Sequence, residues 1–148
     1  MTEQNLGEEL YNLLADLLNR KANMTVLNSI RGEYGVLRYL VYIQDYVTAG
    51  HLSEQLRVVP GRMTDILNSL ESKGLVVRDR DPKDKRRVKV SVTEKGKIQA
   101  KQMREHISKE YEGMFQILGK KDTEEFIRLL KIVLSYSNEE VFDFPPTN

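Results

Sequence analysis

Residues 48–92 read TAGHLSEQLRVVPGRMTDILNSLESKGLVVRDRDPKDKRRVKVSV, and their order of signals predicts two short helices joined by a tight turn. Thr48 can begin the first helix, because its hydroxyl can accept a hydrogen bond from a backbone N–H two or three residues further on. Pro60 suits the first position of the second helix, where a missing backbone N–H does no harm. Gly74 suits the end of that helix, because glycine adopts a left-handed conformation freely.

A charged segment between two short apolar segments follows the second helix. Leu75–Val77 predicts one strand, and Val88–Val92 alternates valine with polar residues, as in a strand with one buried face. The intervening Arg78–Arg87 contains six cations and three aspartates, and its Asp81-Pro82 pair favours a turn. The sequence therefore predicts a β-hairpin wing, and a fold that is mainly α with a small β component (α+β): a winged helix-turn-helix.

The second helix has one apolar and one polar face. Met63, Ile66, Leu67 and Leu70 follow the i, i+3, i+4, i+7 spacing of a buried stripe. The second helix of a helix-turn-helix enters the DNA major groove, where asparagine and arginine pair with purines and aspartate accepts from cytosine. The residues expected to contact DNA, on this helix and on the wing, are Gly61, Arg62, Thr64, Asp65, Asn68, Ser69, Lys73, Arg78, Arg80, Asp84, Lys85, Arg86 and Arg87. The alternatives are an ordinary solvated helix surface and a solvated charged turn.

Helices are also predicted on both sides of this segment. Leucines at helical spacing predict a helix over 3–20, residues 32–47 predict another, and residues 23–30 between them predict a loop. After the wing, Thr93 and Glu94 open a long helix whose apolar positions continue to Leu118, and a last helix follows. The whole chain, 1–148, is expected to form a single domain.

Charge and composition narrow the classes of function. Residues 51–97 hold 12 Lys/Arg against 7 Asp/Glu, whereas residues 1–50 and 98–148 are each net acidic. A basic middle suits phosphate contacts with double-stranded DNA, although a mixed-charge surface is the plain alternative.

Several classes of protein find no support in the sequence. The chain has no cysteine, which excludes a disulfide framework, a thiol switch and thiolate metal sites, and it has only two histidines. It shows no apolar run of membrane-spanning length and no signal-peptide pattern in residues 1–4, so a cytoplasmic protein is expected. It shows no Gly-rich phosphate loop, nucleophile elbow or metalloenzyme motif, so we expect neither an enzyme nor a bound metal or cofactor.

The segment from about Thr48 to Gly96 resembles the MarR family of bacterial transcriptional regulators. The resemblance rests on Leu70–Val76 (LESKGLV), Asp81–Arg86 (DPKDKR) and Val90–Gly96 (VSVTEKG). It implies a homodimer held together by residues 1–31 and 98–148, around a DNA-binding lobe at 32–97. It also implies a regulator, usually a repressor, that binds a pseudo-palindromic operator with its recognition helices in successive major grooves. Arg86, supported by Asp84, would then act in the minor groove.

The resemblance further implies that a small phenolic or other lipophilic ligand releases the DNA. Tyr11, Tyr34, Arg38, Tyr42 and His51 are candidates for lining its site, although tyrosines at helical spacing are more often core or interface residues.

Three positions depart from the family pattern. Val59 stands where a small polar cap is usual, Arg57 where glycine is common, and Asp65 where a basic or neutral residue is usual. The alternative function is therefore a winged-helix protein-interaction module that does not read DNA specifically.

Overall fold

The computed structural model describes residues 2–135, except for the side chains of residues 22, 25 and 28. The last part of the predicted dimerisation segment, residues 136–148, lies outside the described residues. The chain divides into two compact units, Met1–Glu110 and Tyr111–Asn148, and each is considered by itself. No helix within residues 2–135 is both long and apolar enough to cross a bilayer.

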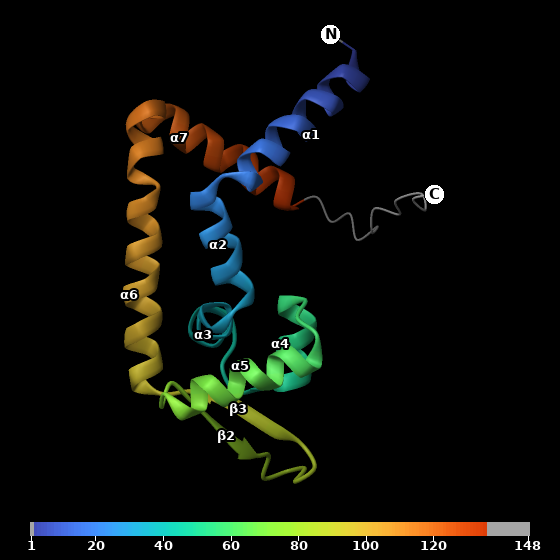
Figure 1. Cartoon of the computed structure of the whole chain (residues 1–148), viewed down its shortest axis with the longest axis vertical. Coiled ribbons are helices and arrows are strands. Elements are labelled where there is room, and N and C mark those ends of the chain that lie inside the picture. The colour runs from blue at the N-terminus through green and yellow to red at the C-terminus, as the bar shows by residue number, and fades with distance from the viewer. Residues whose placement is uncertain (1, 136–148) are drawn as a thin grey trace. The chain divides into compact units, whose positions relative to one another are not determined.

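The first unit contains six helices and a small sheet in the described residues (Figure 1). In chain order its elements are α1 (Glu3–Asn19), α2 (Lys21–Arg31), α3 (Glu33–Tyr42), β1 (Val47–Thr48), α4 (Ala49–Leu56), α5 (Pro60–Ser72), β2 (Val76–Arg80), β3 (Val88–Val92) and α6 (Glu94–Glu110). The predicted fold class is confirmed: the unit is mainly helical, with a helix-turn-helix (α4 and α5) followed by a β2–β3 hairpin.

The sheet has one strand more than the hairpin that was predicted. It is antiparallel with strand order β1-β3-β2, and β1 pairs Val47 with Val90 and Thr48 with Lys89. The helix expected over 32–47 was therefore too long, because α3 ends at Tyr42 and the chain reaches β1 through Tyr46, whose φ is +58°. Through its pairing with β3, strand β1 thus connects the start of the helix-turn-helix to the base of the wing.

Three other expected boundaries were wrong. The loop expected over 23–30 is helix α2, joined to α1 through the extended residue Arg20. Strand β2 continues to Arg80, so the wing's loop is 81–87 rather than 78–87. The long helix expected to run on to Leu118 ends at Glu110.

The core lies among α3, α4, α5 and the sheet. Its most completely buried side chains are Val36, Leu37, Leu40, Leu52, Met63, Leu67, Leu70, Leu75, Val76 and Val90. The start of α6 approaches this core closely, because a Cβ on Gly96 would collide with the Leu75 carbonyl oxygen and with Val92. The helix-turn-helix and the wing therefore pack on one shared hydrophobic core.

The second unit is described over Tyr111–Ser135 and consists of α7 (Glu112–Ser135). This helix is interrupted at Gly119, whose φ is +77°. Among the described residues of α7, Thr123 is buried. The large apolar side chains of α7 are exposed within the single chain.

Candidate nucleic-acid interface

Local sequence signals position α5 as predicted. The Thr48 hydroxyl accepts a hydrogen bond from the His51 N–H at 3.1 Å and caps α4. Pro60 is the first residue of α5, and Gly74 follows its end with a φ of +73°. The ends of both helices are therefore set by residues within the helix-turn-helix itself.

The two faces of α5 are those expected from its spacing. Met63, Ile66, Leu67 and Leu70 are all buried, and the opposite side is solvent-exposed. The exposed residues there are Gly61, Arg62, Thr64, Asp65, Asn68 and Ser72. This leaves a polar surface with small side chains, of a kind that can approach the edges of base pairs.

On one side, α5 is tied to the start of α3. The Glu33 carboxylate accepts hydrogen bonds from the Ser69 hydroxyl at 2.5 Å and from Lys73 Nζ at 3.0 Å. Partial burial raises the pKa of Glu33, but the hydrogen bonds from Ser69 and Lys73 and the charge of Lys73 outweigh burial, so the pKa is lowered overall. Ser69 and Lys73, both expected to contact DNA, thus already have a carboxylate partner.

On the other side, α5 is tied to the wing through Arg78 of β2. The guanidinium donates to both carboxylate oxygens of Glu71, at 3.1 and 3.2 Å, and to Asn68 Oδ1 at 2.6 Å. The hydrogen bond from Arg78 lowers the pKa of Glu71. Arg78, another expected DNA contact, therefore bridges β2 to the exposed face of α5.

The loop of the wing is shaped by its aspartates. Asp81 Oδ1 accepts from the Lys83 N–H at 3.0 Å, and Asp84 Oδ1 accepts from the Arg86 N–H at 3.1 Å. Asp84 also pairs with the Arg86 guanidinium at 3.3 Å, while 92 % of the Arg86 side chain stays exposed. The structure therefore presents Arg86 to solvent from an ordered turn.

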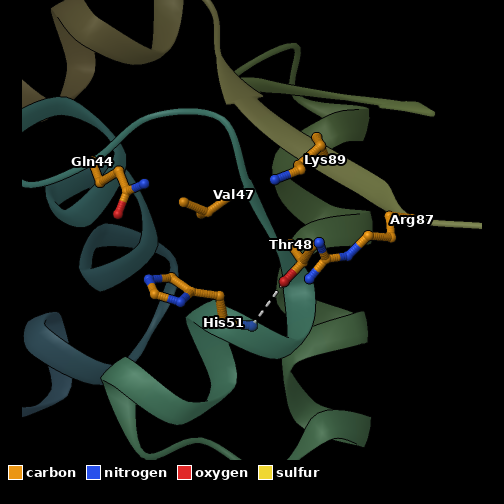
Figure 2. A pocket seen from close by; sticks show the side chains of 6 residues that line it. All are labelled: Gln44, Val47, Thr48, His51, Arg87 and Lys89. Atoms are coloured by element: carbon orange, nitrogen blue, oxygen red, sulfur yellow. Dashed lines mark hydrogen bonds between the residues drawn. The ribbon is translucent and has the colours of Figure 1, made fainter. Parts of the chain in front are cut away.

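A shallow polar pocket lies at the base of the wing. Figure 2 shows Arg87 and Lys89 beside Thr48 and His51, with Gln44 and Val47 completing the lining. His51 Nε2 lies 2.7 Å from the hydroxyl oxygen of the buried Tyr39. His51, expected to line a ligand site, thus lines this pocket and contacts the buried Tyr39.

The other candidate ligand residues separate into two places. Tyr34, Arg38 and Tyr42 lie four residues apart along α3, whereas Tyr11 lies on α1 and is 69 % exposed. Burial raises the pKa of Tyr34 and the nearby Tyr42 raises it further, against smaller lowering effects of two arginine charges. The structure thus keeps three of the five candidates together.

Sequence reasoning missed three residues of these clusters. Arg104 of α6 stacks on the Tyr42 ring, 4.3 Å from its centroid, and Glu33 and Glu71 hold the two sides of α5. The spacing of these residues from their partners carries no periodic signal, so only the folded chain brings them together. No group of three His, Cys, Asp or Glu side chains within the described residues could hold a metal ion.

Residues 27–87, which span the helix-turn-helix and most of the wing, match the sequence model of the MarR family. In this segment the chain is similar to the MarR family. This similarity, together with that to HTH-type transcriptional regulators, supports a DNA-binding transcriptional regulator of winged helix-turn-helix type.

Known proteins resemble the chain over most of its length. It is 26 % identical over 106 residues to the HTH-type transcriptional regulator YwhA of Bacillus subtilis, covering 72 % of this chain and 76 % of YwhA. A MarR transcriptional regulator from Methanosarcina mazei has 26 % identity and a TM-score of 0.68, with 86 % of this chain and 95 % of that one covered. FabT from Streptococcus pneumoniae, solved in complex with DNA, has 21 % identity and a TM-score of 0.60, covering 91 % and 96 %, and supports the fold.

The three departures from the MarR pattern have distinct structural settings. Arg57 ends α4 with a φ of +54°, in the left-handed region that favours glycine. Val59 precedes α5 without making a side-chain cap and is 69 % exposed. Asp65 lies on the exposed face of α5, so it adds a negative charge to the surface expected to meet DNA.

Proposed function

We propose that this protein is a transcriptional regulator, most simply a repressor, that binds a pseudo-palindromic operator as a homodimer. The observation that carries the proposal is the exposed polar face of α5 beside a hairpin that holds Arg86 in solvent. In this arrangement α5 enters the major groove, and Arg86 enters the neighbouring minor groove, whose negative potential attracts arginine. FabT, a protein of the same fold, was solved in complex with DNA, which supports DNA binding by this chain.

The exposed apolar surfaces of the terminal helices support the homodimer. Helix α1 has no buried residue, and Leu6, Leu10, Leu13, Leu14, Leu17 and Leu18 are between 43 % and 58 % exposed. Exposed apolar stripes of this size are typical of surfaces that a second chain covers. A dimer would place two copies of α5 against the two half-sites of one operator.

We also propose a small phenolic or lipophilic anion as the effector, bound beside the α3 surface formed by Tyr34, Arg38 and Tyr42. The aromatic rings offer apolar contact, and the charges of Arg38 and Arg104 favour an anion. Titrating the protein–DNA complex with substituted benzoates tests this proposal. Wild type should release the DNA, and Arg38→Gln should need several-fold more of the compound; an equal response of the two proteins would contradict the site.

The first experiment is a fluorescence-anisotropy titration of the protein against the intergenic DNA upstream of its own gene, at two salt concentrations. Phosphate contacts release counterions, so the affinity of a true operator complex should fall steeply with salt and survive competitor DNA. Weak binding that is equal for every duplex tested, including a randomised duplex pool, would contradict the proposal. That outcome would favour the protein-interaction module suggested by Asp65 and the uncapped start of α5.

A further inference from the structure

The contact between the wing and α5 bears on which base the protein selects. Asn68 lies on the exposed face of α5, and its Oδ1 accepts a hydrogen bond of 2.6 Å from Arg78 Nη2. The same guanidinium is held by both oxygens of Glu71, and its side chain is only 25 % exposed. Glu71 therefore fixes the position of the Arg78 guanidinium, and Arg78 in turn fixes the position of the Asn68 amide.

The chemistry of the pair determines the orientation of the Asn68 amide. A guanidinium has only donors, so the amide atom that faces Arg78 must be the oxygen, and flipping the amide would place two donors against each other. The NH₂ group of Asn68 is consequently the end that is not engaged by Arg78. A charge-assisted bond is also stronger than a neutral one, so an approaching base has to compete with Arg78 for the oxygen.

We infer that Arg78 is a positioning residue that makes Asn68 a hydrogen-bond donor, so that α5 selects guanine rather than adenine at the base pair Asn68 meets. Asparagine recognises adenine by accepting from N6 and donating to N7 at the same time, and so needs its oxygen. Guanine presents two acceptors, O6 and N7, in the major groove, and the NH₂ group alone can donate to them.

This inference rests on the proposed DNA binding, and it gives Arg78 a different role from the direct DNA contact expected from the sequence. Selection from a randomised duplex pool by the full-length protein, followed by sequencing of the bound fraction, tests it. Asn68→Ala should lose the base preference at one position in each half-site and keep the preferences at the other positions. The position that loses its preference is the base pair that Asn68 contacts. Wild type should prefer guanine there over adenine by at least about tenfold.

The decisive variant is Arg78→Met, which keeps much of the side chain's length and removes its donors. With the oxygen of Asn68 freed, the preference at that position should move from guanine towards adenine, by about tenfold or more in their ratio. Arg80→Met is the matched control, because Arg80 is an exposed cation two residues along the same strand. It should weaken binding to all duplexes without changing the preference at that position.

The possible outcomes separate the inference from the proposed function. A wild-type protein that enriches no duplex would overturn DNA reading itself. A wild-type preference for adenine at the Asn68 position, or an unchanged preference in Arg78→Met, would overturn the role of Arg78 while leaving the regulator intact. Should Arg78→Met fail to fold, Arg78→Lys serves, because one ammonium cannot reproduce the forked contact; the preference for guanine should then fall several-fold.

Discussion

Glu33 joins two helices that are far apart in the sequence. It lies in the first turn of α3 and accepts hydrogen bonds from Ser69, 36 residues away, and from Lys73, 40 residues away. Two donors, one in the last turn of α5 and one at its C-cap, thus converge on one carboxylate. Because α5 carries the exposed polar face, Glu33 contributes to fixing the direction in which that face points.

Glu33→Gln should lower the free energy of unfolding by about 1 kcal/mol at pH 7, the usual contribution of such hydrogen bonds at a partly exposed site. Folding lowers the pKa of Glu33, so its stabilising effect is complete above the ordinary glutamate pKa. The effect is lost as the pH falls through the lowered pKa. Urea unfolding at pH 7 and near pH 3 should therefore show a difference between the two proteins that shrinks in acid.

Glu124→Gln provides the control for this experiment. Glu124 makes an exposed pair with Lys120 at 3.9 Å, so its replacement should change stability by less than about 0.5 kcal/mol. If Glu33→Gln lost the same free energy of unfolding at both pH values, the charge of the Glu33 carboxylate would not contribute to the contact between α3 and α5.

Side-chain burial on α5 could be predicted residue by residue, but the partners of its polar side chains could not. The spacing of Met63, Ile66, Leu67 and Leu70 determines which side faces the core, and all four are buried. The engagement of Ser69 by Glu33 depends instead on how α3 crosses α5, and no local pattern encodes that crossing.

The wing is an element whose turn is built by its own aspartates. Asp81 and Asp84 accept backbone N–H groups within the loop, and the Asp81 N–H donates to the Arg87 carbonyl at 2.8 Å. Five residue pairs, from Val76–Val92 to Arg80–Val88, continue the pairing through the two strands. The hairpin can therefore hold Arg86 away from the core at a set position.

Arg86→Ala should weaken operator binding by about 1–3 kcal/mol if this arginine enters the minor groove. Its melting temperature should match wild type, because the side chain is 92 % exposed and packs against little besides Asp84. Anisotropy titrations at one salt concentration measure the first effect, and circular dichroism measures the second. Lys101→Ala, which removes an exposed cation of α6, is the control, and the wing assignment fails if both variants bind equally well.

At the level of elements, the sequence was informative where the signals were strong and misleading where the elements were short. Residues 23–30 contain asparagine, threonine and serine, which have modest helix propensity, so the segment resembled a loop although it forms most of α2. Strand β1 has two residues, too few for any alternation, and it exists because Val90 and Lys89 of β3 offer it partners. Tertiary contacts decided both cases.

At the scale of the whole molecule, each compact unit leaves apolar helix surface exposed. In the first unit this surface is α1, which buries none of its residues within the chain. In the second unit, Ile117, Val133 and Leu134 of α7 are 87 %, 66 % and 81 % exposed. A folded monomer in water would be unusual with so much unburied leucine, isoleucine and valine, so both units are expected to be covered by a second copy of the chain.

Replacing Leu10 and Leu17 together by glutamate should convert the proposed dimer to a monomer. The two leucines lie in the middle of the apolar stripe of α1, and charges buried there without partners are strongly unfavourable. Asn12→Glu adds a charge to the polar side of the same helix and should leave the dimer intact. Light scattering coupled to size-exclusion chromatography measures the mass of each protein.

The same variants connect assembly to DNA binding. A monomer engages one half-site only, so the double variant should bind the full operator at least about a hundredfold more weakly, with little change on an isolated half-site. The winged helix-turn-helix core is built from residues of α3 to α6 and does not include α1, so its circular dichroism signal and fold should persist. A double variant that stays dimeric would show that α1 is not the interface, and wild-type protein that is itself monomeric would contradict the dimer altogether.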